Sequence, residues 1–201
     1  MLFLNVLTKL IRMEKVFGSI ADLQFGLYEK PVESGDTVYL QVKDFDENNQ
    51  FSNAPSTFLI SDEKSIKHLL KDGDVIFVAK GFRNFAWTYR ESIGPAIASS
   101  IFFVVKVDTS EIIPEYLTAL FNSSAYLQMF QLLGAGSSIP SIRKSELEAI
   151  KIQVPSLELQ RKTVMINELY LKELQLTTQI IDEKQKYYNS IINKLISQEH
   201  V

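Results

Sequence analysis

The sequence contains no cysteine, which excludes disulfide bonds, thiolate metal sites and a cysteine nucleophile. Histidine is nearly absent as well, and the two that occur, His68 and His200, have no serine or carboxylate partner close by in the sequence. Glycine-rich phosphate-binding motifs are missing, because the pair Gly134 and Gly136 lacks a third glycine and does not follow a strand. We therefore expect no catalytic residues, no metal site and no cofactor.

The chain has neither a long hydrophobic run nor a strong excess of one charge. No segment approaches the roughly 18 apolar residues of a membrane span. Residues 1–11 are apolar, but Lys9 interrupts them and no basic region precedes them, so we read them as a short helix or as an extension upstream of a start at Met13. The net charge of −3 argues against a free-standing nucleic-acid binder but leaves room for a basic patch. With the lack of cysteine, these features favour a cytoplasmic protein that does not enter a membrane.

Residues 1–155 have the pattern of a folded domain. Hydrophobic residues make up 46% of the whole chain and aromatic residues 11%, so a sizeable core is expected. Apolar runs and turn residues predict strands at residues 37–42, 57–60, 75–79, 96–100, 101–107 and 150–155, and helices at residues 61–70, 115–121 and 124–132. Strands and helices mixed in this irregular order predict an α+β domain.

The end of the chain, residues 156–201, follows a different pattern. Glycine and proline are absent from residues 156–198, which predicts one helix about 60 Å long. Its apolar side chains recur in a heptad pattern that also includes Thr177 and Lys184, and these apolar positions are Tyr170, Leu174, Ile181, Tyr188, Ile191 and Leu195. We expect a spacer helix that pairs with a second copy of the chain. The alternative is a helix that folds back on its own domain.

One loop combines cations and aromatic residues in the way that a nucleic-acid contact requires. Residues 80–90 hold three cations among four aromatic residues, and arginine and asparagine can read guanine and adenine in the major groove. The candidate DNA contacts in this loop are Lys80, Arg83, Asn84, Trp87, Tyr89 and Arg90, and those of a second patch are Ser137, Ser138, Arg143 and Lys144. The alternative is a hairpin whose Phe82, Phe85 and Trp87 pack into the core.

Two short acidic segments deserve a structural interpretation instead of a catalytic one. Residues 62–64 and 182–184 each place a lysine one residue after an acidic pair, which formally matches half of a nuclease metal site. Both segments lie in predicted helices, and such tripeptides are frequent in charged chains. We interpret them as solvated helix faces, together with Lys67 and Lys71.

Three stretches in this order resemble the DNA specificity subunit of type I restriction–modification systems. Residues 69–78 (LLKDGDVIFV), followed by Lys80 and Gly81, are similar to the family's Gly-Asp turn, apolar strand and glycine loop. Residues 113–117 (IPEYL) resemble its Pro-x-Tyr-Leu helix. Residues 147–162 resemble the junction between its recognition domain and spacer helix, although Ser156 replaces a proline and Leu159 replaces an acidic residue.

This resemblance implies a target recognition domain that reads one half of a split DNA site. It also implies a spacer helix that sets the distance between the half-sites and docks methyltransferase and restriction subunits. Specificity subunits usually carry two such units, so this chain resembles a half-subunit that would form a homodimer on double-stranded DNA. The chain itself would be non-catalytic. A protein-interaction adaptor that kept the fold but no longer reads DNA is the alternative.

Overall fold

The computed structural model describes residues 12–51, 55–135 and 138–198. The expected helix at residues 1–11 therefore lies outside the described residues, as do Ser137 and His200. Contacts divide the chain into two compact units, one up to Val164 and the other from Met165 onward. The boundary expected at residue 155, between a DNA-reading part and a spacer, concerns function and stays a prediction.

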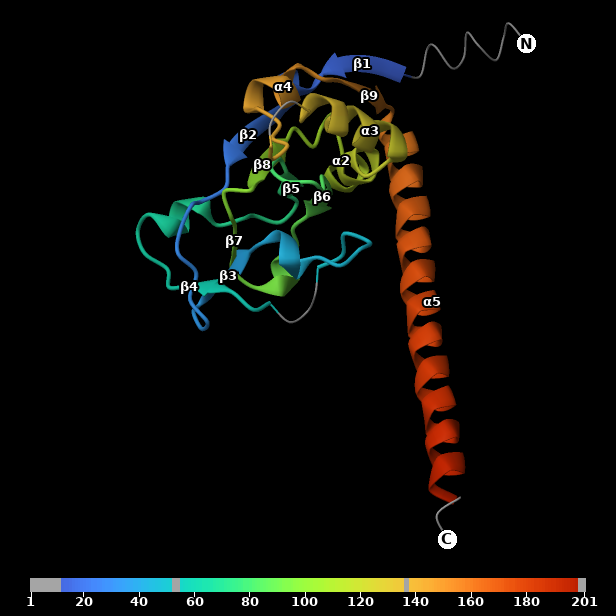
Figure 1. Ribbon diagram of the computed structural model, residues 1–201. Helices are drawn as coiled ribbons and strands as arrows, with labels where there is room; N and C mark the ends of the chain where they lie inside the picture. Colours follow the sequence, from blue (N-terminus) through green and yellow to red (C-terminus); the bar gives the residue numbers. More distant parts are fainter. Residues whose placement is uncertain (1–11, 52–54, 136–137, 199–201) are drawn as a thin grey trace, which may run out of the picture. The chain divides into compact units, whose positions relative to one another are not determined.

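A four-stranded antiparallel sheet forms the centre of the first unit (Figure 1). In order across the sheet, its strands are β2 (Ala21–Phe25), β8 (Phe102–Val107), β5 (Val75–Val78) and β6 (Ala86–Thr88). Strand β5 and residues 102–105 of β8 are continuous apolar runs, and all of these residues are buried. Successive side chains point to opposite faces, so Val75 and Phe77 join one core while Ile76 and Val78 join the other.

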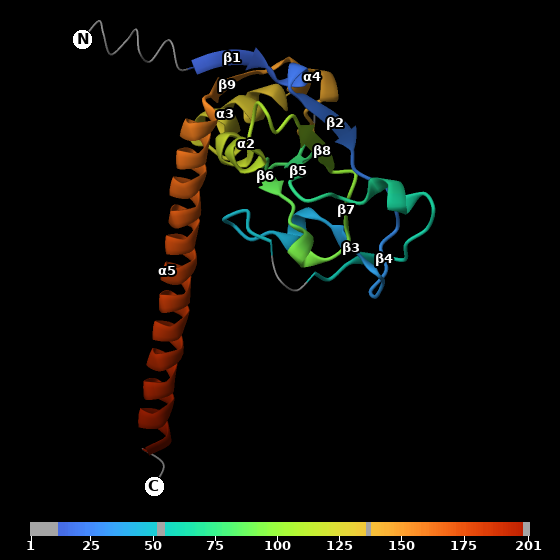
Figure 2. The same cartoon turned by 180° about the vertical axis from the view of Figure 1, so that it is seen from behind.

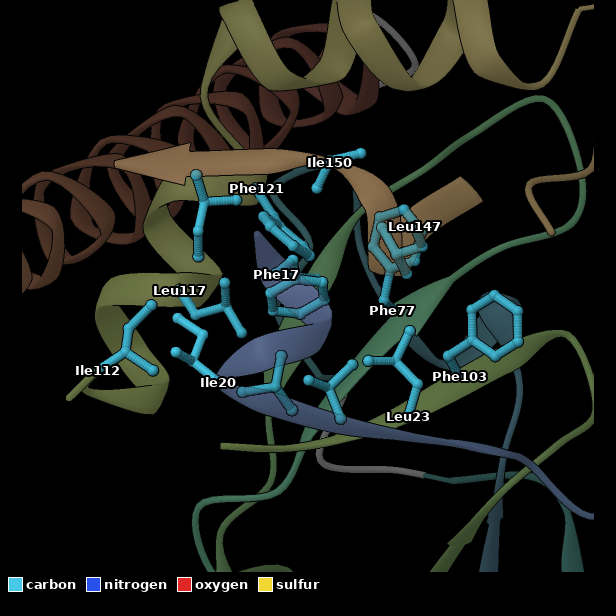
Figure 3. Packing of buried hydrophobic residues seen from close by; sticks show 14 of the residues in the cluster. Phe17, Ile20, Leu23, Phe77, Phe103, Ile112, Leu117, Phe121, Leu147 and Ile150 are labelled. Carbon is cyan, nitrogen blue, oxygen red and sulfur yellow. The ribbon is translucent and has the colours of Figure 1, made fainter. Parts of the chain in front are cut away.

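The first core lies between this sheet and three helices. These helices are α2 (Pro114–Phe121), α3 (Ser124–Leu133) and α4 (Lys144–Ala149). Figure 3 shows how Phe17, Phe77 and Phe121 meet there, and the Phe77 ring also lies 4.7 Å from that of Phe130. All four rings are fully buried, so this aromatic cluster lies at the contact between the sheet and the helices.

The second core joins the opposite face of the sheet to a smaller, three-stranded one. That sheet has the order β4 (Phe58–Leu59), β3 (Thr37–Leu40) and β7 (Ala96–Ala98), and β3 runs parallel to β7. Its centre is aromatic: the buried Phe45 ring touches Phe51, Phe85 and Trp87 at centroid distances of 5.8, 5.1 and 5.3 Å. Seen from behind in Figure 2, β3, β4 and β7 again lie at the end of the domain away from α2, α3 and α4.

The first and last strands of the domain pair with each other as a two-stranded ribbon. Strand β1 (Arg12–Val16) pairs antiparallel with β9 (Lys151–Pro155), and α5 (Leu157–Gln198) begins two residues after Pro155. Ser156 is positioned as the N-cap of this helix, because its hydroxyl accepts a hydrogen bond from the Leu159 N–H at 3.4 Å. The long helix predicted from the lack of glycine and proline is therefore confirmed, as are the strands and the α+β class.

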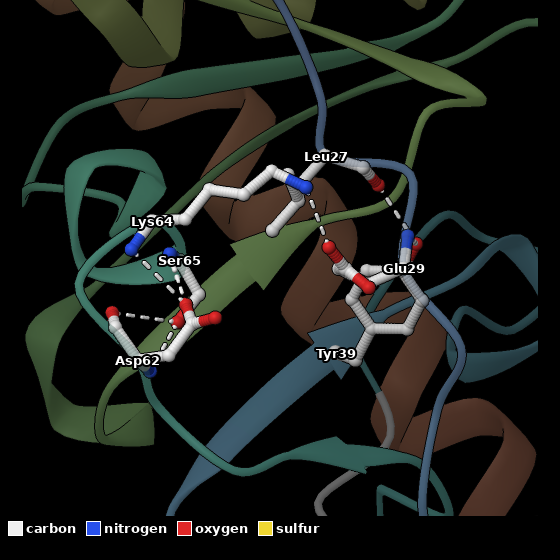
Figure 4. Close-up of polar contacts among 6 residues, drawn as sticks. All are labelled: Leu27, Glu29, Tyr39, Asp62, Lys64 and Ser65. Carbon is white, nitrogen blue, oxygen red and sulfur yellow. Dashed lines mark hydrogen bonds and ion pairs between the residues drawn. The ribbon is translucent and has the colours of Figure 1, made fainter.

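Short 3₁₀ turns complete the domain at η1 (Phe17–Ser19), η2 (Val42–Asp44), η3 (Ser65–His68) and η4 (Glu91–Ile93). The helix predicted for residues 61–70 is wrong, because only η3 forms there. The Asp62 carboxylate accepts hydrogen bonds from the N–H groups of Lys64 and Ser65, at 3.1 and 2.6 Å, and so closes a local turn (Figure 4). Aspartate and serine compete in this way with helical backbone bonds.

Candidate nucleic-acid interface

The structure brings together the two candidate patches that lie far apart in the sequence. The hairpin between β5 and β6 runs beside residues 138–143, and Lys80 forms a β-bridge with Ser141. The Gly81 N–H donates to the Pro140 carbonyl and the Ile142 N–H donates to the Ala79 carbonyl, both at 2.9 Å. Lys80 therefore belongs to the same small ladder as the second patch.

The outer residues of this ladder are accessible to a ligand. Lys80 of the ladder is exposed, as are Ser138 and Arg143 of the second patch, while Ile142 is buried. Lys144 is half-buried and its ammonium group lies 3.5 Å from the carboxylate of Glu148, one helical turn along α4. The surface thus offers cationic and hydroxyl groups, which are the groups that hold phosphates.

Two of the predicted contacts hold the hairpin itself. The Arg83 guanidinium donates to the Asp46 carbonyl and to the Asn49 side-chain oxygen, the latter at 2.6 Å, and it lies 4.8 Å from the centre of the Phe85 ring. The Asn84 amide donates to the Val78 carbonyl at 2.8 Å. Arg83 and Asn84 therefore have structural roles, whatever further contact they make.

The remaining predicted contacts in this loop are directed inward or paired. Trp87 is half-buried against Phe45, and Tyr89 is only 2% exposed, with its hydroxyl donating to the Gly94 carbonyl at 2.7 Å. Burial raises the pKa of the Tyr89 phenol above its usual value. This position argues against the predicted DNA contact by Tyr89, because a base cannot reach a buried ring.

Arg90 forms ion pairs within the domain. Its guanidinium lies 3.3 Å from the Asp72 carboxylate and also pairs with Glu115 at the start of α2.

The alternative interpretation, a hairpin whose aromatic residues pack into the core, is correct for Phe85, which is fully buried, and wrong for Phe82, which is 82% exposed. The sequence did not single out Phe82 as a site residue, because its apolar character indicated the core.

The acidic segment at residues 62–64 is a structural turn (Figure 4). Hydrogen bonds from Ser65 lower the pKa of the Asp62 carboxyl, and the Lys64 ammonium pairs with Glu29 at 2.7 Å. Within the described ranges no three histidine or acidic residues are grouped closely enough to hold a metal ion. Residues 62–64 therefore link two neighbouring segments of the domain.

Helix α5 presents the predicted seam to solvent over its described length. Tyr170, Ile181, Tyr188 and Leu195 are each between 56 and 60% exposed. Leu174 is half-buried, and Ile191 is 39% exposed. Among the described helices, none has both the length and the apolar content needed to cross a membrane. The exposed seam is the pattern of a helix that packs against a partner helix.

Residues 27–185 match the family model of the type I restriction modification DNA specificity domain. The matched segment starts before the three-stranded sheet and extends well into α5, so it includes most of the chain. The chain therefore belongs to this family. A comparison with curated protein sequences finds no significant match.

Solved structures of type I restriction–modification proteins share the fold. The S subunit from M. genitalium has a TM-score of 0.61 at 15% identity, over 87% of this chain and 43% of its own. The HsdS subunit from Thermoanaerobacter tengcongensis has a TM-score of 0.56 at 17% identity, over 87% of this chain and 46% of its own. A chain from a study of complex assembly in the type I R-M system has a TM-score of 0.51 at 16% identity, over 96% of this chain and 48% of its own. The present chain thus spans a little under half of each of these proteins.

Proposed function

We propose that this chain is a non-catalytic DNA-specificity half-subunit, which reads one half of a bipartite site in double-stranded DNA. The observation that carries the proposal is the family match over residues 27–185, because it includes most of the domain and much of the helix. The exposed residues Lys80, Ser138 and Arg143, which lie on the hairpin and on the segment bridged to it, support a DNA contact at the domain. In this proposal methyltransferase and restriction subunits dock on the chain and carry out the chemistry, in the cytoplasm.

We further propose that two copies pair through α5 and present two equal domains to a palindromic split site. The exposed seam supports this pairing, since apolar side chains at heptad spacing are buried when two helices associate. Thr177 and Lys184 within the seam would fix the register of the pair. A homodimer supplies in two chains what a protein of twice this length supplies in one.

The experiment that tests the pairing is light scattering of the full chain and of Ile181→Asp. A charge in the seam should turn a dimer into a monomer. Gln179→Asp is the matched control, because residue 179 lies on the opposite side of the helix and is also exposed. A wild-type monomer would rule out self-association, and the hypothesis to test would then be that α5 pairs with a different half-subunit.

DNA reading is tested by the salt dependence of binding to labelled duplexes, with the methyltransferase subunit present. A specificity protein binds some sequences more tightly than others and loses affinity as salt displaces its phosphate contacts. The second candidate, a protein-interaction adaptor, is favoured by the internal pairing of Arg83 and Arg90 and by the net charge of −3. It predicts binding to a protein subunit without any salt-dependent affinity for DNA.

A further inference from the structure

Phe82 is an aromatic residue whose position the fold leaves unexplained. Its side chain is 82% exposed at the tip of the hairpin between β5 and β6, while Phe85 in the same hairpin is fully buried. Single exposed apolar residues are common on protein surfaces, so exposure alone indicates nothing. The backbone hydrogen bonds and the charged residues around Phe82 distinguish it from such residues.

Hydrogen bonds fix the hairpin on both sides of Phe82. Gly81 adopts a left-handed φ of 115°, which favours glycine, and its N–H donates to the Pro140 carbonyl at 2.9 Å. On the other side, the Asn84 amide donates to the Val78 carbonyl at 2.8 Å. The tip is thus tied to the domain at both ends, and little conformational freedom would be lost when it binds a ligand.

Cations lie on the same ladder as this tip. Lys80 is paired with Ser141, and cross-strand partners project from the same face of a ladder. Ser141 and Arg143 are both exposed with Ile142 buried between them, so Arg143 continues the face that carries Lys80. Glu146 is the acidic residue nearest to Arg143 in the sequence, and its carboxylate accepts a hydrogen bond from the Arg143 backbone N–H at 2.7 Å. An exposed aromatic ring on a hairpin that also presents an exposed lysine, and that pairs with the segment carrying the exposed Arg143, matches a polyanion that also has apolar surface.

We propose that Phe82 is an apolar base contact in duplex DNA, with Lys80 and Arg143 binding neighbouring phosphates. The inference rests on the proposed function and adds a residue that reads bases. Phenylalanine contacts the thymine methyl group in the major groove, or enters a base step as a wedge. Phosphate contacts from lysine and arginine position the protein on the duplex but carry no sequence information.

The test uses the full chain, with the methyltransferase subunit present, to enrich duplexes from a randomised pool, and then compares the best enriched duplex with a scrambled one. Phe82→Ala should weaken binding to the enriched duplex by about 5- to 150-fold, with no change on the scrambled duplex and the same salt slope. Lys80→Ala should weaken binding to both duplexes and reduce the salt slope by about one. Tyr28→Ala is the matched control, because Tyr28 is an 83% exposed aromatic residue elsewhere on the domain.

Each other outcome overturns the proposal in a recognisable way. If Phe82→Ala binds the enriched duplex within about twofold of the wild type, the base contact is wrong and DNA reading stands. Equal losses on both duplexes would mean that Phe82 supports phosphate binding or folding, and Phe82→Leu with a melting curve separates these. If Phe82→Ala keeps DNA binding but no longer holds the methyltransferase subunit, the ring contacts protein. A wild-type chain that enriches no duplex removes the proposed function and this inference together.

Discussion

The domain and the helix that follows it treat their apolar side chains in opposite ways. In the domain, adjacent residues such as Ile76 and Phe77 are buried in separate cores on the two faces of one strand. In the helix, Tyr170, Ile181 and Tyr188 are more than half exposed. Burial of apolar surface is the main favourable contribution to folding. The domain therefore buries its own apolar surface, whereas the helix leaves the apolar side chains of its seam exposed, as the proposed pairing requires.

The largest expected effect tests this difference directly. Phe77→Ala should lower the free energy of unfolding of the domain by about 3–5 kcal/mol, because it leaves a cavity against Phe121 and Phe130. Ile181→Ala should leave the unfolding of the domain unchanged. Urea unfolding followed by the fluorescence of Trp87, the single tryptophan, reports on the domain alone. Equal shifts of the urea midpoint in the two variants would show that domain and helix unfold as one unit.

A second experiment concerns the first turns of α5, which belong to the domain. Gln160 is fully buried, its oxygen accepts from the Ile113 N–H at 2.8 Å, and its amide donates to the carbonyls of Glu111 and Pro155. Gln160→Ala should cost about 1–3 kcal/mol, because buried backbone groups lose their partners. The exposed Gln179→Ala should cost less than about 0.5 kcal/mol. Chemical denaturation measures both.

Gln160→Glu sharpens this test through pH. A buried carboxylate facing two carbonyl oxygens would have a pKa above its unfolded value of about 4.3. The variant should therefore be least stable at neutral pH and should recover stability as the pH falls toward that value. A loss of stability that is the same at all pH values would contradict a buried, unsolvated position for this side chain.

Parts of the fold were readable from local pattern. β5 and the first four residues of β8 are apolar without alternation, which indicates strands covered on both faces, and α5 follows from the lack of glycine and proline. The Asp62 turn was missed because a helix N-terminus and a closed turn use the same residue types. Only the three-dimensional structure shows that the Asp62 carboxylate closes the turn onto Ser65.

The candidate site was less predictable, because its residues act through distant partners. Cations and aromatic residues in residues 80–90 have the same pattern whether they contact DNA or the protein itself. The groups that hold Arg83 are at Asp46 and Asn49, far away in sequence, and nothing in the loop identifies them. The bridge from Lys80 to Ser141 is likewise a long-range pairing. Composition therefore identified the loop as a candidate, but it could not show which of its residues hold the fold together and which are free to contact DNA.

Two substitutions test whether Arg90 stabilises the fold and Lys80 contacts DNA. Arg90→Met should lower the unfolding free energy by about 1 kcal/mol, because it removes partly exposed ion pairs with Asp72 and Glu115. The salt slope of DNA binding should not change. Lys80→Met should reverse this pattern, with unchanged stability and a slope smaller by about one. Thermal melting and binding titrations at several salt concentrations give both readings, and a reduced slope for Arg90→Met would return that residue to the interface.

The smallest expected effect concerns a carboxyl group inside the domain. Asp74 is 7% exposed, and burial raises the pKa of its carboxyl even though it accepts a hydrogen bond from the Lys71 N–H at 2.9 Å. The folded state thus holds this proton more tightly than the unfolded state, whose pKa is about 3.9. Stability should then fall as the pH rises through the interval between these two pKa values.

Asp74→Asn removes this titration and retains an oxygen that can accept the same hydrogen bond. We expect the variant to be more stable than the wild type at neutral pH, with a difference that shrinks as the pH falls and disappears below about 3.9. Unfolding curves at several pH values measure it. Asp182→Asn is the control on the exposed helix and should change stability by less than about 0.5 kcal/mol. A less stable Asp74→Asn at neutral pH would mean that the hydrogen bond and the nearby Lys106 outweigh burial.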